Sequence, residues 1–260
     1  MQAAPAWRGE SFFVLQQLVL KDFRIRYRNM SLGLLWSLIN PLVMMGMLVF
    51  IFSYVQKPSV SQPAFPVFIL CGLVPFNFFT GAWISGTVSV VDSQALIKKV
   101  PVPRELVPIA AVLSNGVHLL IQLALLFVFL FAYGRGPNIH WFWLPVIWIL
   151  DIVFVCGLAL FTSAVNVFIR DTRYVVESAN LILFWLVPIF YSFASIPAQY
   201  HNLYRFNPAA AMTLAMRNIL LEEKSPPDSL LTILCFVSIA SFILGWLVFR
   251  RLKPGFYDHI

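Results

Sequence analysis

Residues 141–168 read WFWLPVIWILDIVFVCGLALFTSAVNVF, and Asp151 is the one charged residue among them. A helix needs ~20 mostly apolar residues to cross the hydrocarbon core of a bilayer, so this stretch is long enough to span a membrane. The same apolar character recurs in residues 32–54, 66–91, 106–131, 179–193 and 230–248. The sequence therefore predicts an all-α membrane protein with six transmembrane helices.

Composition and the placement of charge agree with this prediction. The 260 residues are 60% hydrophobic and 11% charged, which is more apolar surface than one soluble core buries. If the N-terminus is cytoplasmic, most of the 18 Lys and Arg residues fall on cytoplasmic segments, as the positive-inside rule requires. The net charge of +7 then reflects membrane topology. We expect both termini in the cytoplasm and no nucleic-acid partner.

Motifs for catalysis and cofactor binding are missing from the sequence. It contains no G-x-x-x-x-G-K-[ST] phosphate loop and no H-E-x-x-H motif. Cys71, Cys156 and Cys235 lie in apolar runs, without zinc spacing or a disulfide pattern. We therefore expect one membrane domain over residues 1–260, with no catalytic residue, metal or cofactor of its own.

Residues 10–29 predict an amphipathic helix in the membrane interface, ahead of the first span. At ~100° per residue, its apolar side comprises Phe12, Leu15, Val19, Phe23 and Tyr27. A second side carries Lys21, Arg24 and Arg28, and Asp22 and Arg26 are spaced as an i,i+4 pair. This spacing fits a simple membrane anchor as well as a helix that also grips a partner.

Two connections have helical character. Residues 92–104 begin with Asp92 and Ser93, which can cap a short helix that Pro101 ends. That segment is either a lever in the cytoplasm or a basic loop that only fixes topology. On the outer side, residues 207–223 start with an Asn-Pro helix signal and are too apolar for a free loop. They form either outer gate helices between spans five and six or a lid that only packs on the bundle.

Polar residues inside the spans have two explanations. Asp151 lies at about the depth of Gln122, with His118 one turn deeper. The group fits a proton relay or a hydrogen-bonded knot, because buried polar groups also pair for structural reasons. A relay through Asp151 and His118 would suit an ion-coupled secondary transporter, but the paired interrupted helices of such transporters are not found in this sequence.

Aromatic residues make up 16% of the chain, more than two interfacial belts require. Sugar rings slide over aromatic faces, so aromatic side chains on the spans are candidates for lining a transport path. For each residue singly, a lipid-facing or interfacial position is the ordinary explanation. The candidates are Trp36, Phe76, Phe78, Phe79, Trp83, Phe184, Trp185, Phe190 and Tyr191.

Several stretches resemble, in order, the ABC-2 type permeases that export O-antigen, capsule and teichoic acid polymers. They are KDFRIRYR (21–28), LGLLW (32–36), FILCGLVPFNFF (68–79), LIKKVPVPRELVP (96–108), NVFIRDTRY (166–174) and PIFYSFASIP (188–197), followed by Asn207-Pro208 and Arg217. The resemblance covers nearly the whole chain. It implies a homodimer in the bacterial cytoplasmic membrane, with two ATP-binding subunits that hold ATP and Mg and drive export of an undecaprenyl-diphosphate-linked polysaccharide. The alternative is export of another lipid-linked or amphipathic substrate.

The resemblance also implies roles for individual residues. The interface helix, with the cations that would attract a lipid diphosphate, would use Lys21, Asp22, Arg24, Arg26, Tyr27 and Arg28. Coupling to the ATPase would involve Asp92, Leu96, Ile97, Lys98, Lys99, Val100 and Arg104, with Leu96, Ile97 and Val100 as its apolar face. The channel would be lined by the aromatic candidates, where a helix bent at Pro188 turns Tyr191 toward the pore. The outer gate would contain Asn207, Pro208 and Arg217.

Overall fold

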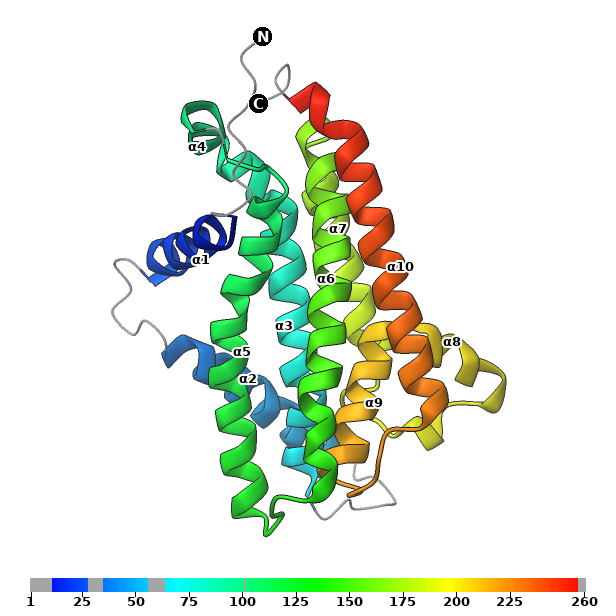
Figure 1. Ribbon diagram of the computed structural model, residues 1–260. Coiled ribbons are helices and arrows are strands. Elements are labelled where there is room, and N and C mark those ends of the chain that lie inside the picture. Colours follow the sequence, from blue (N-terminus) through cyan, green and yellow to red (C-terminus); the bar gives the residue numbers. More distant parts are fainter. Residues whose placement is uncertain (1–10, 28–34, 56–63, 101, 257–260) are drawn as a thin grey trace.

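The computed structural model describes residues 11–27, 35–55, 64–100 and 102–256, and it contains no β-strand within those ranges (Figure 1). Five of its helical stretches are long and apolar enough to cross a membrane. They are α2 (Trp36–Val49) with the π-helical η2 (Phe50–Val55), α3 (Phe65–Asp92), α5 (Leu106–Ala132), η3 (Ile139–Phe142) with α6 (Trp143–Phe168), and α10 (Asp228–Leu252) with η6 (Lys253–Gly255). These five agree with the predicted spans.

The predicted span over residues 179–193 is wrong in its bounds. The helix there, α7, covers Thr172–Leu186 and ends ahead of Pro188. Val187 is extended, with ψ 133°, because the ring of a following proline disfavours the helical conformation. A helix of 15 residues is ~22 Å long, which is shorter than a hydrocarbon core of ~30 Å. The prediction of a helix bent at Pro188 is therefore also wrong.

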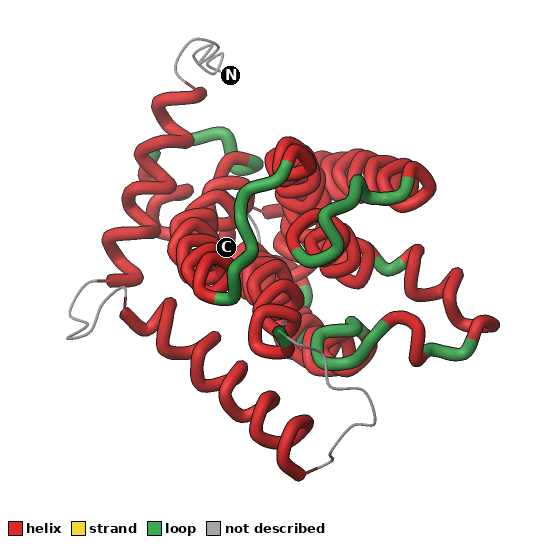
Figure 2. Tube along the Cα trace, turned by 90° about the horizontal axis from the view of Figure 1, so that it is seen from below, coloured by secondary structure: helices red, strands yellow, loops and turns green. Residues whose placement is uncertain are grey.

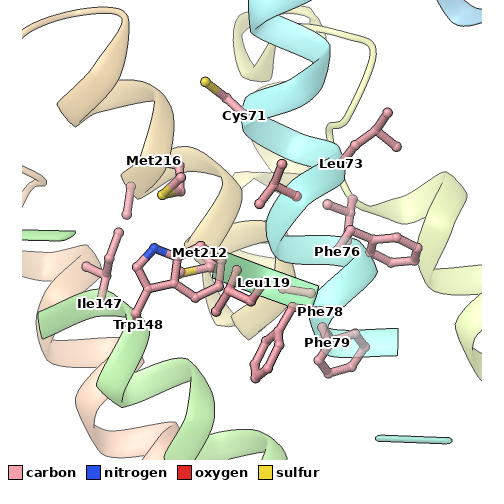
Figure 3. Packing of buried hydrophobic residues seen from close by; sticks show 14 of the residues in the cluster. Cys71, Leu73, Phe76, Phe78, Phe79, Leu119, Ile147, Trp148, Met212 and Met216 are labelled. Carbon is pink, nitrogen blue, oxygen red and sulfur yellow. The ribbon is translucent and has the colours of Figure 1, made fainter. Parts of the chain in front are cut away.

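Helix α3 occupies the centre of the bundle. Most of its residues between Val67 and Val90 are buried, and it contacts α2, α5, α6, α7 and α9 (Pro208–Leu220). Figure 3 shows side chains of α3 packed with Trp148 of α6 and with Met212 and Met216 of α9. The ring of Phe78 meets that of Trp148 edge-on at 5.9 Å between centroids. A central helix with apolar residues all round fits this position.

Helices α6 and α10 approach each other more closely than side chains would allow. A Cβ atom added to Gly245 would collide with the backbone of Gly157, and one added to Gly157 would collide with the backbone of Ser241. The hydroxyl of Ser241 also donates to the carbonyl of Phe154 at 3.1 Å. We call this contact the glycine seam. Small residues at a helix crossing allow close packing where burial from water contributes little.

Helix α2 is arranged differently. It runs at a steep angle to the upright helices, as seen from the side in Figure 1 and along the bundle in Figure 2. It packs against α3 and α5, while Val43, Met47 and Phe50 remain exposed. The first span is therefore loosely held compared with α3.

The end of the bundle near α4 (Gln94–Lys99) is closed by a second apolar cluster. Leu18 of α1 (Ser11–Tyr27), Ile97, Val107, Phe249 and Phe256 are all buried in it. Polar contacts reinforce this end. Lys253 pairs with Glu105 at 2.8 Å, and Arg104 donates to the carbonyl of Lys253 at 3.1 Å. The C-terminal end of α10 is thus fastened to the segment that follows α4.

Candidate functional site

A cavity of about 800 Å³ lies between α2, α3 and α5. Its position is close to the middle of both long helices, because it includes Asn77 of α3 (65–92) and Leu119 of α5 (106–132). Amide, hydroxyl and imidazole groups share its wall with apolar side chains. The polar members are Ser37, Asn40, Asn77, Thr80, Asn115, His118 and Gln122. The larger apolar members are Trp36, Met44, Met47, Leu73, Phe76, Phe78, Leu119 and Phe184.

Hydrogen bonds between helices hold part of this polar wall. The hydroxyl of Ser37 and Nδ1 of His118 lie 2.7 Å apart, which joins α2 to α5. Asn77 donates from Nδ2 to Oε1 of Gln122 at 3.4 Å, and Asn115 donates from Nδ2 to the hydroxyl of Ser85 at 2.6 Å. Polar groups in a membrane are normally satisfied in this way. Of these polar residues, only His118 and Gln122 were predicted from the sequence. The three- and four-residue spacing of Asn115, His118 and Gln122 is the signal that was missed.

Asp151 belongs to a different part of the bundle. It is buried, with 2% of its surface exposed, and it does not line the cavity. Its Oδ2 atom has no hydrogen-bond partner among the described residues. The structure therefore separates the three polar residues that the sequence analysis grouped as a relay or a hydrogen-bonded knot. His118 and Gln122 face the cavity together, and Asp151 is separate from them.

The aromatic candidates fall into two sets. Trp36, Phe76, Phe78 and Phe184 line the cavity, while Phe79, Trp83, Trp185, Phe190 and Tyr191 do not. Ring contacts nevertheless connect six of them in a row, which we call the aromatic chain. On α3, the ring centroids of Trp83 and Phe79 lie 5.5 Å apart, and those of Phe79 and Phe76 lie 6.3 Å apart. The row continues from Phe76 to Phe184 at 5.6 Å, from Phe184 to Phe190 at 6.1 Å and from Phe190 to Tyr191 at 5.2 Å. The aromatic chain leads from the cavity to the segment that follows α7.

Tyr191 is fixed by hydrogen bonds at the end of this chain. Its hydroxyl lies 3.0 Å from the carbonyl oxygen of Trp185, 3.1 Å from that of Leu186 and 3.3 Å from the hydroxyl of Tyr204. The last carbonyl groups of a helix lack partners within the helix. Tyr191 therefore caps the C-terminal end of α7, which is a structural role.

The outer segment starts at the residue that the sequence indicated. Asn207 accepts a hydrogen bond from the backbone N–H of Ala209 at 3.2 Å, and Pro208 is the first residue of α9. A short helix, α8 (His201–Phe206), precedes it. Nearly every residue of α9 is buried, and the helix packs against α3, α6 and α10. The packing expected of a lid is thus present, and α9 lies inside the bundle at the end opposite α4 (Figure 1).

Arg217 of α9 is buried and holds three segments together. Its guanidinium donates to the carbonyl of Ile189 at 2.7 Å and to that of Phe68 at 3.3 Å, and it lies over the ring of Phe68 at 3.4 Å from the centroid. A weaker contact of 3.5 Å reaches the carbonyl of Tyr191. Arginine suits this position because its donors point in several fixed directions and its flat face stacks on aromatic rings. The residue predicted for the outer gate therefore locks α9 to α3 and to the segment after α7.

The segment over residues 92–104 contains the short helix α4, and its predicted coupling residues differ in exposure. Asp92, Lys98, Lys99 and Val100 are exposed, and Leu96 is half-buried. The apolar face predicted from Leu96, Ile97 and Val100 is not one docking surface, because Ile97 is 9% exposed and belongs to the same buried cluster as Leu18 of α1. Burial of a large aliphatic side chain contributes ~1.5–3 kcal/mol, so Ile97 anchors α4 to the bundle. Arg104 is buried as well, in its contact with Lys253.

Helix α1 covers part of the same end of the bundle. Its buried side is centred on Leu18 and packs on α5, while Phe12 and Phe13 are exposed. Lys21 lies 3.3 Å from the carboxylate of Asp22 and donates to the hydroxyl of Ser93 at 3.4 Å, which links α1 to the start of α4. Arg24 is exposed. Arg28 and the side chains of Arg26 and Tyr27 lie outside the described residues.

Comparison with known proteins identifies the family of this chain. Residues 14–221 match the ABC-2 type transporter family. The chain is 32% identical over 251 residues to the O-antigen export system permease protein RfbA of Klebsiella pneumoniae, and the alignment covers 96% of each chain. It is 27% identical to a protein of the same name from Myxococcus xanthus, over 95% of each chain. It is 23% identical to the polysialic acid transport protein KpsM of Escherichia coli, over 91% of this chain and 92% of that relative. These matches span the bundle, the cavity and both of its ends, and the chain belongs to the ABC-2 type transporter family.

Proposed function

We propose that this chain is the transmembrane subunit of an ATP-driven exporter that moves a lipid-linked polysaccharide across the bacterial cytoplasmic membrane. The observation that carries the proposal is the similarity to O-antigen export permeases over nearly the full length of both chains. The sequence has no phosphate-binding loop, so ATP and Mg would be bound by a separate subunit.

The proposed assembly is a homodimer with two ATP-binding subunits. Helix α4 presents exposed polar and charged groups beyond the membrane helices, at the end where α10 also finishes (Figure 1). Lys98, Lys99, Arg250 and Arg251 gather there, which supports a cytoplasmic location for this end. Asp92, Lys98, Lys99 and Val100 would then contact the ATPase.

In this proposal α7 belongs to the fifth of six membrane-spanning segments, which is added to the five long helices. Its exposed apolar side chains include Leu181, Ile182 and Trp185. The buried segment from Val187 to Phe190 extends α7 toward α9, and α7 and α9 together would complete this crossing of the membrane. The exposed face of α7 and that of α2 are suited to contact a second copy of the chain, with the aromatic chain beside the resulting path.

The proposal is tested in cells that lack this chain. We expect them to accumulate lipid-linked polysaccharide inside and to lose it from the surface, and the full-length chain to restore export only together with an ATP-binding subunit that hydrolyses ATP. Surface polymer is measured with a lectin or antibody, and the inner pool by extraction of the lipid-linked precursor. Normal surface polymer in the absence of the chain contradicts the proposed function.

A further inference from the structure

The cavity between α2, α3 and α5 is polar at a depth where membrane proteins are normally apolar. Asn115 and Gln122 lie on either side of the middle of α5, and Asn77 and Thr80 lie at the middle of α3. Polar side chains at this depth are costly and usually face protein or water, where they serve a function. Its volume of about 800 Å³ falls within the range of small-molecule sites, which is ~300–1,000 Å³.

The chemistry of the wall favours a neutral ligand rich in hydroxyl groups. No Lys, Arg, Asp or Glu is present among the described residues that line the cavity. Side-chain amides both donate and accept hydrogen bonds, as the hydroxyl groups of a sugar do. A phosphate or an acidic sugar would instead require cationic partners. An inorganic cation would require carboxylate or several carbonyl ligands.

The wall also retains hydrogen-bonding capacity. Asn77 and Gln122 share one contact of 3.4 Å, which is beyond the usual range of ~2.7–3.2 Å, and each amide has further donor and acceptor sites. Asn40 faces the same space from α2 and is exposed. Trp36, Phe76 and Phe184 add apolar faces beside these amides. Amides next to aromatic faces match the alternating polar edges and apolar faces of a sugar ring.

We propose that this cavity binds an uncharged sugar unit of the exported polymer, with Asn40, Asn77 and Gln122 bonded to its hydroxyl groups and Trp36, Phe76 and Phe184 against its ring. The inference rests on the proposed function and adds two statements to it. The transported glycan enters the space between α2, α3 and α5, and the part of it that lies there is neutral.

Photo-crosslinking in the assembled exporter tests the inference. Met44 lines the cavity and is 38% exposed, so Met44→p-benzoylphenylalanine places a reactive group in it without removing a polar contact. Leu120→p-benzoylphenylalanine is the matched control, because Leu120 lies outside the cavity lining and is 67% exposed. Trp185→p-benzoylphenylalanine reports on the aromatic chain outside the cavity. Cells are irradiated with an ATP-binding subunit that cannot hydrolyse ATP, and the sugars attached to the purified chain are identified by mass spectrometry.

The outcomes separate this inference from the proposed function. Neutral sugars attached at position 44 and none at position 120 are the expected result. Acidic sugars at position 44 overturn the assignment of a neutral ligand. Glycan attached at position 185 but not at position 44 overturns the cavity site and leaves the exporter intact. Glycan at none of the three positions overturns the proposed function together with the inference.

Substitution of the amide pair distinguishes binding from helix packing. Gln122→Leu and Asn77→Leu should each lower the yield of glycan adduct about fivefold, the effect of losing one hydrogen bond, at unchanged abundance of the chain. The exchanged pair Asn77→Gln with Gln122→Asn keeps both amides and should restore the yield. Equal losses of adduct and abundance in the leucine variants would assign the pair to helix packing and overturn its role in binding.

Discussion

The glycine seam between α6 and α10 and the cavity between α2, α3 and α5 are opposite solutions for packing membrane helices. At the seam, Gly157 and Gly245 bring two backbones into contact, and no space remains for a Cβ atom. At the cavity, by contrast, a space of about 800 Å³ remains between α2, α3 and α5, and Gly116 of α5, outside the lining, has no heavy atom within 4 Å of an added Cβ. The bundle therefore combines a tightly packed half with a half that leaves room for a ligand.

The largest expected effect comes from breaking the seam. Gly245→Ala places a Cβ atom on the backbone of Gly157, and overpacking of this kind costs ~1–3 kcal/mol or more because backbone cannot move aside easily. We expect a strongly lowered melting temperature and low abundance in membranes. The matched control is Gly116→Ala, which should be neutral or stabilising, since alanine gains ~1 kcal/mol over glycine within a helix. Equal behaviour of the two variants would remove the distinction between the halves.

The second prediction concerns the packed side at α9. Arg217→Met removes the donors to Ile189 and Phe68 while keeping an unbranched side chain, and it should lower stability by ~2–4 kcal/mol through carbonyl groups left without a partner. Arg217→Lys should recover only part of this loss, because an ammonium group cannot stack on the ring and reach both carbonyls. Thermal unfolding of the purified chain measures the effect. Full rescue by lysine would show that the charge alone matters.

The third prediction uses the difference in exposure along α4. Ile97→Asp puts a carboxylate among Leu18 and Val107, so it should lower stability by about 2–4 kcal/mol. Val100→Asp changes an exposed residue, so it should leave the fold intact and reduce recovery of the ATP-binding subunit. Co-purification and melting temperature are measured for both. If Ile97→Asp were as stable as the parent chain, α4 would not be anchored through that side chain.

The smallest effect on stability is expected at the cavity. Trp36 lines it and is 48% exposed, so Trp36→Ala should change stability by less than ~1 kcal/mol and yet reduce surface polymer several-fold. The matched change Leu120→Ala removes an exposed side chain from α5 outside the cavity and should preserve export. Export is measured per unit of chain in the membrane. An equal loss of export in both variants would contradict the distinction between the cavity and the lipid-facing surface.

Hydropathy predicted the long helices because each crosses the membrane as an apolar run of the required length. The bounds of residues 106–131 differ from those of α5 by one residue at the end. The prediction failed at α7, where polar residues from Thr172 onward are helical and Pro188 prevents continuation. Hydropathy does not detect a polar first turn of a helix. The end of α7 was predictable, because Val187 precedes Pro188 and a residue before proline is disfavoured in a helix.

The site was only partly predictable, since spacing shows which residues share a helix face but not what lies opposite. Ser85 of α3 meets Asn115 of α5, a contact that the spacing within either helix does not predict. Tyr191 was predicted to line a pore, and the structure adds that its hydroxyl caps α7, a role that no spacing indicates. Ile97 is buried in a cluster that includes Leu18, which lies far away in the sequence. Contacts between distant segments decide such roles.

The two halves of the glycine seam are synthesised at different times. Gly157 enters the membrane with α6, whereas Gly245 belongs to α10, which leaves the ribosome after the other long helices of the described residues. Until α10 arrives, the groove at Gly157 can be filled by lipid tails, which are as apolar as the helix that replaces them. The backbone contact at Gly157 and Gly245 is then completed after the other long helices of the described residues have been inserted. A nascent chain that has not reached Asp228 therefore lacks the contact that holds α6 against α10.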